Sequence, residues 1–451
     1  MAPTASLALT LAAIVAVASF ASPVAILICG VPMLFIAIAF RRLNRWRVNC
    51  GATYVWGGRA VSPYFGFAVG WIIQLAYLVG VVSIVLPIGP YLASLFGQSN
   101  RRPLEAVIGF AATILVTVVA YVGIRTSAWV QWLLIAIEYV GITILAIYSL
   151  VGVFGHQAHA VSFHLSWLGW GTLGGVGGLV AAALIAVYLF SGWDTAILLN
   201  EETTNPKVTP GNAVVTTVVV VGFMFAVLTF AFQGAVSTRE LESHSDALSC
   251  VGQVRGGLWL GTYMVLAVGL SALGSTRATL VSGVRITFAM SADGVLPSVF
   301  GKTHATFKTP HVATIVVAWL AAAGVWIFSL GSNTVQASFT TMVSVDGLLF
   351  ALFYALTGVA TAVYFRKRVS RRRGSAILLV LMPALAAVFL FFISWDSVSG
   401  LGGWTGGSMV SLYVMFAIGA AVMAWGRWRA RSAYYRLPRE ADDPDEATAA
   451  V

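Results

Sequence analysis

The chain has 451 residues, of which 59% are hydrophobic and only 9% are charged, and its mean hydropathy is +0.90. Soluble domains carry roughly 25% charged residues, so this composition excludes a soluble globular protein and predicts a chain embedded in lipid. The formal net charge of +10 would suggest a nucleic-acid partner in a soluble protein. Here the basic residues gather in a few loops between apolar segments, so no nucleic-acid partner is predicted.

Twelve stretches are apolar over about the 20 residues that a helix needs to cross a bilayer. We therefore predict an all-α integral membrane protein with about 12 transmembrane helices. The approximate limits of the spans are residues 5–20, 24–42, 63–95, 104–124, 128–154, 178–203, 212–235, 256–290, 310–330, 336–365, 375–395 and 407–426.

The basic residues predict how these spans are oriented. When the loop after the second span is placed in the cytoplasm, most of the 26 Lys and Arg residues fall on the cytoplasmic side. This distribution follows the positive-inside rule. Both termini are then expected in the cytoplasm.

The sixth span carries the feature that points most directly to function. Ser191 and Gly192 lie inside it, and Asp194 follows them. A glycine in a helix interior costs about 1 kcal/mol relative to alanine, and an ionisable residue at membrane depth suggests a functional site. Secondary transporters bind substrates at such interrupted helices. A kinked packing helix with a snorkelling Asp194 is the alternative.

Three other charged residues are expected at membrane depth. Glu138 is a candidate for proton coupling, because burial disfavours a charged carboxyl; the alternative is a neutral, hydrogen-bonded core residue. Asp346 is a weaker candidate. Arg277 needs a buried partner, because a lone charge costs several kcal/mol, and we expect Glu138 or Asp194 in that role.

Three segments together indicate a known family. They are FSGWDTAILLNEETTNPKVTPGNA in and after the sixth span, SGVRITFAMSADGVLPSVFGKTHATFKTP at the exit of the eighth, and NCGATYVWGGRAVSPYFGFAVGW before and into the third. The chain resembles permeases of the amino acid–polyamine–organocation (APC) superfamily, in particular the bacterial amino acid permeases.

The resemblance implies a membrane domain over residues 1–426, built as a five-plus-five inverted repeat with broken first and sixth helices. The first repeat would cover 5–154, the second 178–365, and two peripheral helices 375–426. The tail, 427–451, is basic and then acidic. We expect it to be cytoplasmic and without fixed structure.

The resemblance also implies a substrate at mid-membrane, with its amine on carbonyl groups of the broken sixth helix and its carboxylate on amide groups of the broken first helix. The substrate-binding residues carried over are Phe190, Ser191, Gly192, Trp193 and Asp194. The coupling or gating candidates are Glu138, Arg277, Asp346, Glu201, Glu202 and Arg285. For Glu201 and Glu202 a solvated face is the alternative to a gate.

These observations predict a secondary active transporter that moves amino acids across the plasma membrane, coupled to protons or working by exchange. Arg277 would lie where sodium-coupled relatives hold their ion, so transport without sodium is expected. A polyamine or drug exporter of the same fold is the alternative. A membrane-embedded transferase is a remote one, because it would need an Asp-rich metal motif or a buried His–carboxylate set. No enzyme activity, cofactor or metal is predicted.

The front of the chain departs from the family pattern. A cytoplasmic tail and a first half-helix normally precede the break of the first helix, whereas here Ala2, Pro3 and Thr4 fall where the break should be. We expect either a native start upstream, adding about 30 residues, or a product that does not transport.

Overall fold

The computed structural model describes residues 3–98, 101–123, 128–237, 240–241, 246–331, 335–368, 376–400 and 403–438. Over these ranges the chain forms helices, turns and irregular segments, with no strand. The predicted all-α class is confirmed.

The first half of the chain supplies seven of the α-helices in the described ranges. They are α1 (Pro3–Ala18), α2 (Ser22–Trp46), α3 (Thr53–Ala60), α4 (Pro63–Val85), α5 (Ile88–Leu95), α6 (Arg102–Val122) and α7 (Ala128–Phe154).

The second half begins with a short helix and a shorter continuation, followed by the remaining long helices. They are α8 (Gly175–Leu189), α9 (Thr195–Leu198), α10 (Thr209–Ala235), α12 (Ala247–Gly256), α13 (Leu258–Ala292), α14 (His311–Gly331), α15 (Val335–Phe365), α17 (Met382–Gly400) and α18 (Gly407–Ala424). Short 3-10 turns are η1 (Ser19–Ala21), η3 (Leu165–Leu168), η4 (Asn200–Glu202), η5 (Ser298–Gly301) and η8 (Ala433–Arg436), and π-helical turns are η6 (Ile377–Leu381) and η7 (Trp425–Arg429).

Ten helical segments of the described chain are long and apolar enough to cross a membrane. The twelve predicted spans map onto them with two differences. The first two spans form one continuous segment, Thr10–Trp46, that bends at Ser19, and the sixth is represented by the 15-residue α8 before the helix is interrupted. The division into two repeats stays a prediction.

Prolines set several helix starts and one interruption. Pro63 occupies the first turn of α4, where its missing N–H needs no partner, and the Ser62 hydroxyl accepts from the Phe65 N–H at 3.2 Å. The helix is interrupted next to Pro87, because α4 ends at Val85 and α5 begins at Ile88.

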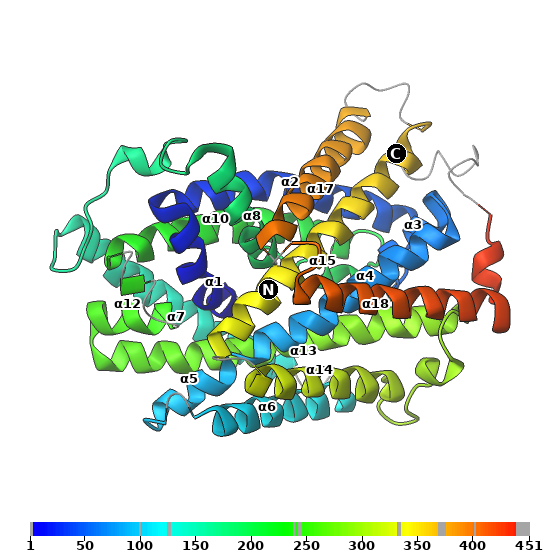
Figure 1. Cartoon of the computed structure of the whole chain (residues 1–451), viewed down its shortest axis with the longest axis horizontal. Helices are drawn as coiled ribbons and strands as arrows, with labels where there is room; N and C mark the ends of the chain where they lie inside the picture. Colours follow the sequence, from blue (N-terminus) through cyan, green and yellow to red (C-terminus); the bar gives the residue numbers. More distant parts are fainter. Residues whose placement is uncertain are drawn as a thin grey trace.

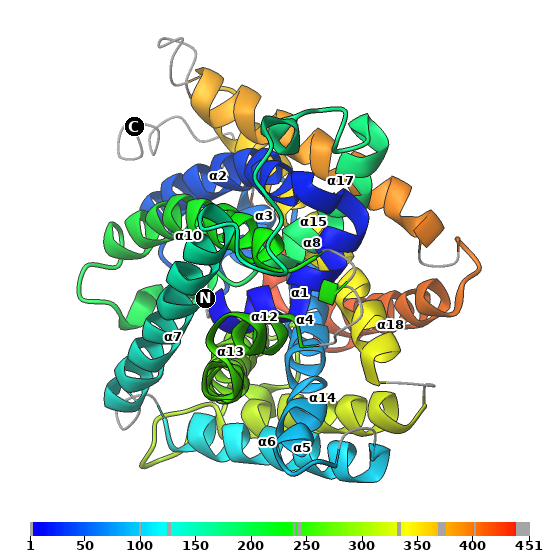
Figure 2. The ribbon, with the colours of Figure 1, turned by 90° about the vertical axis from the view of Figure 1, so that its left-hand side faces the viewer.

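The long helices lie side by side around a centre that contains α1, α4 and α8 (Figure 1 and Figure 2). The α6 and α14 helices pack together on one side of the molecule, and α17 lies on the opposite side against α15 and α2. Thr4, at the start of α1, is fully buried, so this helix begins inside the bundle and not at its periphery.

The prediction that the tail, residues 427–451, has no fixed structure is wrong for the part up to residue 438. Tyr434 and Tyr435 are buried, and the Tyr434 ring stacks on Tyr54 of α3 with a centroid distance of 4.6 Å. The Tyr434 hydroxyl donates to the Tyr54 carbonyl at 3.2 Å. Two aromatic rings supply enough burial to fix this part of the tail. Residues 439–451 lie outside the described part.

The contact between α3 and α4 depends on a missing side chain. A Cβ on Gly66 would lie 2.3 Å from the Tyr434 hydroxyl, 2.4 Å from the Gly58 nitrogen and 2.5 Å from the Tyr54 carbonyl oxygen. Two of these atoms belong to the backbone and cannot move aside cheaply.

Gly66→Ala should therefore destabilise the fold, by about 1–3 kcal/mol, as overpacking does. Thermal unfolding in detergent, compared with the matched Gly171→Ala, where a Cβ meets no atom within 4 Å, measures the effect. Equal stability of the two variants would show that the α3–α4 contact is looser than described.

Candidate functional site

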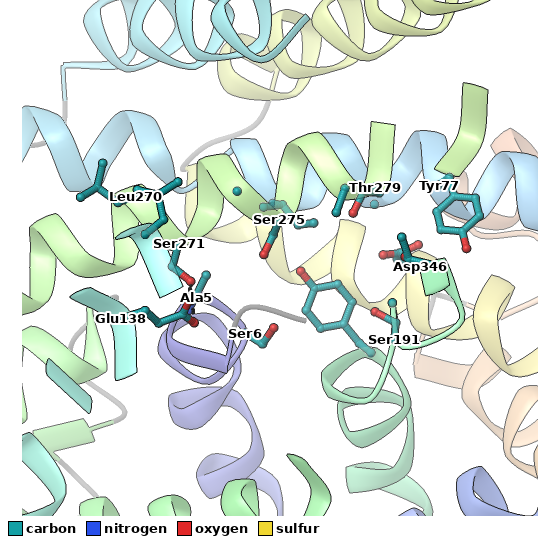
Figure 3. Close-up of a pocket in the computed structure, with 18 of the residues that line it drawn as sticks. Ala5, Ser6, Tyr77, Glu138, Ser191, Leu270, Ser271, Ser275, Thr279 and Asp346 are labelled. Carbon is teal, nitrogen blue, oxygen red and sulfur yellow. Dashed lines mark hydrogen bonds between the residues drawn. The ribbon is translucent and has the colours of Figure 1, made fainter. Parts of the chain in front are cut away.

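A cavity of about 90 Å³ lies at the centre of the bundle, where seven helices or their ends meet. Figure 3 shows Ser271, Ser275 and Thr279 in a row along α13, with Ala5 and Ser6 of α1 opposite them. Residues four apart share one helix face, so α13 presents a hydroxyl-bearing stripe to the cavity. The full lining is Ala5, Ser6, Tyr77, Gly80, Ile84, Leu134, Ile135, Glu138, Tyr188, Ser191, Gly192, Thr195, Leu270, Ser271, Gly274, Ser275, Ala278, Thr279, Asp346 and Phe350.

The predicted interruption of the sixth span opens onto this cavity. The α8 helix ends at Leu189, and helical structure resumes only at Thr195. Gly192 has a φ of +92°, which L side chains rarely adopt. No backbone N–H of the described chain donates to the carbonyl groups of Leu189, Phe190 or Ser191. Unpaired carbonyls at membrane depth are costly, so these are acceptors available to a solute.

Asp194 is held behind the interruption and does not line the cavity. Its side chain is 1% exposed. The Tyr77 hydroxyl of α4 donates to Oδ2 at 2.5 Å, and the Tyr354 hydroxyl of α15 donates to Oδ1 at 3.0 Å. Two phenol donors satisfy the buried carboxylate and fix the turn between two neighbouring helices.

Phe190 and Trp193 are likewise packed away from the cavity. The Trp193 ring stacks on Tyr354 at a centroid distance of 5.1 Å and meets Phe40 edge-on at 5.0 Å. The Phe190 ring lies 6.3 Å from that of Phe225 on α10. Of the five predicted substrate-binding residues, the structure brings Ser191 and Gly192 to the cavity.

Glu138 lies at the other end of the cavity and binds the start of α1. Its Oε1 accepts from the Thr4 N–H at 2.7 Å and from the Ser271 hydroxyl at 2.9 Å. The Ser271 hydroxyl oxygen also accepts from the Ala5 N–H at 3.1 Å. Glu138 thus links α7, α1 and α13. A carboxylate at a helix N-terminus is favoured by the helix dipole.

Asp346 of α15 lines the cavity without comparable partners. It is 1% exposed, and no described residue donates a hydrogen bond to its Oδ1. Gly80 of α4 leaves room beside it, because a Cβ there would lie 3.3 Å from Asp346 Oδ2. In Figure 3 the carboxylate lies near Ser191 and Thr279.

Arg277 does not line the cavity, although Ala278, the next residue of α13, does. The hydrogen bonds described for Glu138 and Asp194 go to Thr4, Ser271, Tyr77 and Tyr354. The predicted pairing of Arg277 with either carboxylate stays a prediction.

The gating candidates lie at the end of the bundle beyond α9. Glu202 and Arg285 form an ion pair between η4 and α13, and both line a second cavity of about 650 Å³. Glu201 is exposed. Burial, with a contribution from neighbouring Glu201, raises the pKa of Cys50 to about 12, so this thiol stays protonated.

The comparisons with known proteins decide the family. A family model described as amino acid permease matches residues 2–425. The chain belongs to the amino acid permease family. The permease is also 26% identical over 288 residues to an uncharacterised transporter of Mycobacterium tuberculosis, covering 64% of this chain and 62% of that one. The match thus spans about three fifths of the relative's length.

Two relatives have more specific names. A branched-chain amino acid permease of Bacillus subtilis is 24% identical over 395 residues, covering 82% of this chain and 79% of the relative. A vacuolar cationic amino acid transporter of Arabidopsis thaliana is 24% identical over 359 residues, covering 75% of this chain and 56% of the relative.

Sequence reasoning missed the residues that hold the permease's site in place. Tyr77 and Tyr354 each lie in the middle of an apolar span, and a buried phenol usually finds a hydrogen-bond partner. That signal could have singled them out, but it could not have named Asp194 as their shared acceptor. Asn200 was also missed; its side-chain amide donates to Asn44 Oδ1 at 2.7 Å and ties η4 to α2.

Asp194→Ala should destabilise the permease, by about 2 kcal/mol or more, because two buried hydroxyls lose their acceptor. Tyr354→Phe removes one donor only and should cost less. Thermal unfolding in detergent measures both, with Tyr413→Phe as the control, since the Tyr413 hydroxyl bonds at an exposed position. An Asp194→Ala variant as stable as this control would show that the two hydrogen bonds do not hold the turn.

Proposed function

We propose that this permease is a secondary active transporter that moves amino acids across the plasma membrane by alternating access. The observation that carries the proposal is the interruption between Leu189 and Thr195, which leaves carbonyl groups without backbone donors and brings Ser191 and Gly192 to the central cavity. An ammonium group is a three-fold donor without acceptors, so it complements such carbonyls. The names of the Bacillus and Arabidopsis relatives support amino acids as the substrate class.

The five residues of the interruption have two roles in this proposal. Ser191 and Gly192 contact the substrate, because they line the cavity. Phe190, Trp193 and Asp194 are positioning residues that hold the turn against α10, α2, α4 and α15 through ring packing and the two tyrosine hydrogen bonds. The chemistry needs no catalytic group, since no covalent bond changes during transport.

Glu138 is the proposed coupling residue. Its carboxylate joins the start of α1 to α13, and hydrogen bonds to an ionised carboxylate are roughly twice as strong as neutral ones. Protonation of Glu138 would weaken both bonds and let α1 move relative to α13. The coupling ion is therefore a proton in this account, and sodium is not required.

Glu202 and Arg285 are the proposed gate on the cytoplasmic side. Their ion pair joins the segment after the interruption to α13, so it must separate if that end of the cavity opens. The basic loops at the same end support a cytoplasmic position for it by the positive-inside rule. Both termini are cytoplasmic in this arrangement.

Uptake into proteoliposomes tests the proposal. The purified chain should accumulate amino acids above the level of empty liposomes, more so with an inward proton gradient than with a sodium gradient. Glu138→Gln should keep amino acid exchange while losing the proton stimulation. Absence of uptake and exchange for all twenty amino acids would refute the function. Uptake that only a sodium gradient drives would refute the coupling.

Gly192→Leu should weaken amino acid binding by at least tenfold. The new side chain would project towards the cavity, and a φ of +92° is strained for leucine. Equilibrium binding of radiolabelled amino acid measures the effect, and Gly171→Leu is the matched control at a loop glycine with open space around it. Unchanged affinity in Gly192→Leu would exclude the interruption as the substrate site.

A further inference from the structure

Asp346 is a buried carboxylate, and the described residues that line its cavity include no cationic side chain to act as its counter-ion. It is 1% exposed, its Oδ1 accepts no hydrogen bond from the described residues, and it lines the central cavity. A buried carboxylate without partners costs several kcal/mol. A buried carboxylate of this kind persists in a folded protein when a ligand pairs with it or a proton neutralises it.

The charge of the cavity favours a cationic ligand. Among the described residues that line it, the charged side chains are Glu138 and Asp346, and no Lys, Arg or His is present. Glu138 is already satisfied by Thr4 and Ser271. The negative charge that remains to be compensated is therefore at Asp346.

The neighbours of Asp346 are acceptors and aromatic rings. Ser191 lies beside it in Figure 3, next to the unpaired carbonyls that end α8. Tyr188 and Phe350 line the same cavity. Carboxylate, carbonyl and aromatic groups together suit a protonated amine, which donates hydrogen bonds and is attracted to aromatic faces.

At the opposite end of the cavity, two backbone N–H groups that could bind an anionic group are already paired within the protein. The Thr4 N–H donates to Glu138 and the Ala5 N–H donates to Ser271, so two amides at the start of α1 are already occupied. A substrate carboxylate would compete there with the protein's own carboxylate. The cavity therefore offers more to the ammonium group of a substrate than to its carboxylate.

We propose that Asp346 is the counter-ion of the substrate's ammonium group, and that the ammonium rather than the carboxylate is the group the cavity requires. This inference rests on the proposed function and narrows its substrate class to primary amines, which include amino acids and also amines that lack a carboxylate. A proton alone on Asp346 is the competing occupant.

Competition binding to the purified chain tests the proposal, with radiolabelled leucine as the reporter. Isoamylamine, which lacks the carboxylate, should compete, whereas 4-methylpentanoate, which lacks the amine, should not. Asp346→Asn should raise the dissociation constants of leucine and isoamylamine by roughly ten- to a hundredfold, as expected for the loss of a charged hydrogen bond. Asp346→Glu, which keeps the charge, should retain most of the affinity.

The control is Asp396→Asn, the same chemical change at an exposed position of α17, which should leave both constants unchanged. Thermal unfolding shows whether each variant is folded. If Asp346→Asn does not fold, Gly80→Ala serves instead, because its Cβ would lie 3.3 Å from Asp346 Oδ2 and from Thr279 Cγ2 and should weaken amine binding severalfold.

Several results would overturn the inference. Competition by 4-methylpentanoate but not by isoamylamine would make the carboxylate the required group. An Asp346→Asn variant with unchanged affinity and an altered pH dependence of transport would make Asp346 a proton site. In both cases the proposed transport of amino acids stands. Failure of the native chain to bind any amino acid would instead refute the proposed function, and this inference with it.

Discussion

The two hydrogen bonds from Tyr77 and Tyr354 to Asp194 are the constraint on which the rest of the site depends. The five-residue segment between α8 and α9 would otherwise gain by winding into a helix, since backbone polar groups at membrane depth need hydrogen-bond partners. The buried Asp194 carboxylate has its two donors on α4 and α15, and a continuous helix would carry it out of their reach. The carbonyl groups of residues 189–191 therefore stay without backbone donors, and Ser191 and Gly192 line the cavity.

The two acids of the cavity differ in what satisfies them, and this difference separates their proposed roles. Glu138 accepts hydrogen bonds from donors on α1 and α13. A change in its charge therefore alters how tightly these two helices are held to α7. The Oδ1 atom of Asp346 has no hydrogen-bond partner among the described residues, so a change in the charge of Asp346 alters which ligands the cavity can bind. The row of hydroxyls on α13 connects the two acids (Figure 3). Eight residues of helix, about 12 Å, separate Ser271 beside Glu138 from Thr279 near Asp346.

Much of the fold could be predicted from the sequence, because lipid imposes simple rules on length and hydropathy. The limits of α7, predicted as 128–154, agree with the structure, and those of α13 and α15 differ by about two residues or fewer. The interruption was predictable from Ser191-Gly192, because glycine has an energetic reason to end a helix there. The short α3 helix was missed, since its eight residues carry no span signal.

The side-chain arrangement of the site could not be predicted to the same degree. Asp194 was expected at the substrate, but its position is set by partners 117 and 160 residues away, and no local pattern encodes such a contact. Asp346 was rated below Glu138, because a sequence shows that an acid is at membrane depth but not whether protein donors satisfy it. The folded part of the tail was missed for a similar reason: Tyr434 packs on Tyr54, far away in the chain.

The central claim is that the interruption of the sixth span is the place where substrate binds. A cryo-electron microscopy map of the permease with a saturating amino acid tests it most directly. Ligand density is expected in the central cavity, with the ammonium about 3 Å from carbonyl oxygens of residues 189–191 and next to Asp346. A continuous helix through Ser191 and Gly192, or a ligand bound away from this cavity, would contradict it.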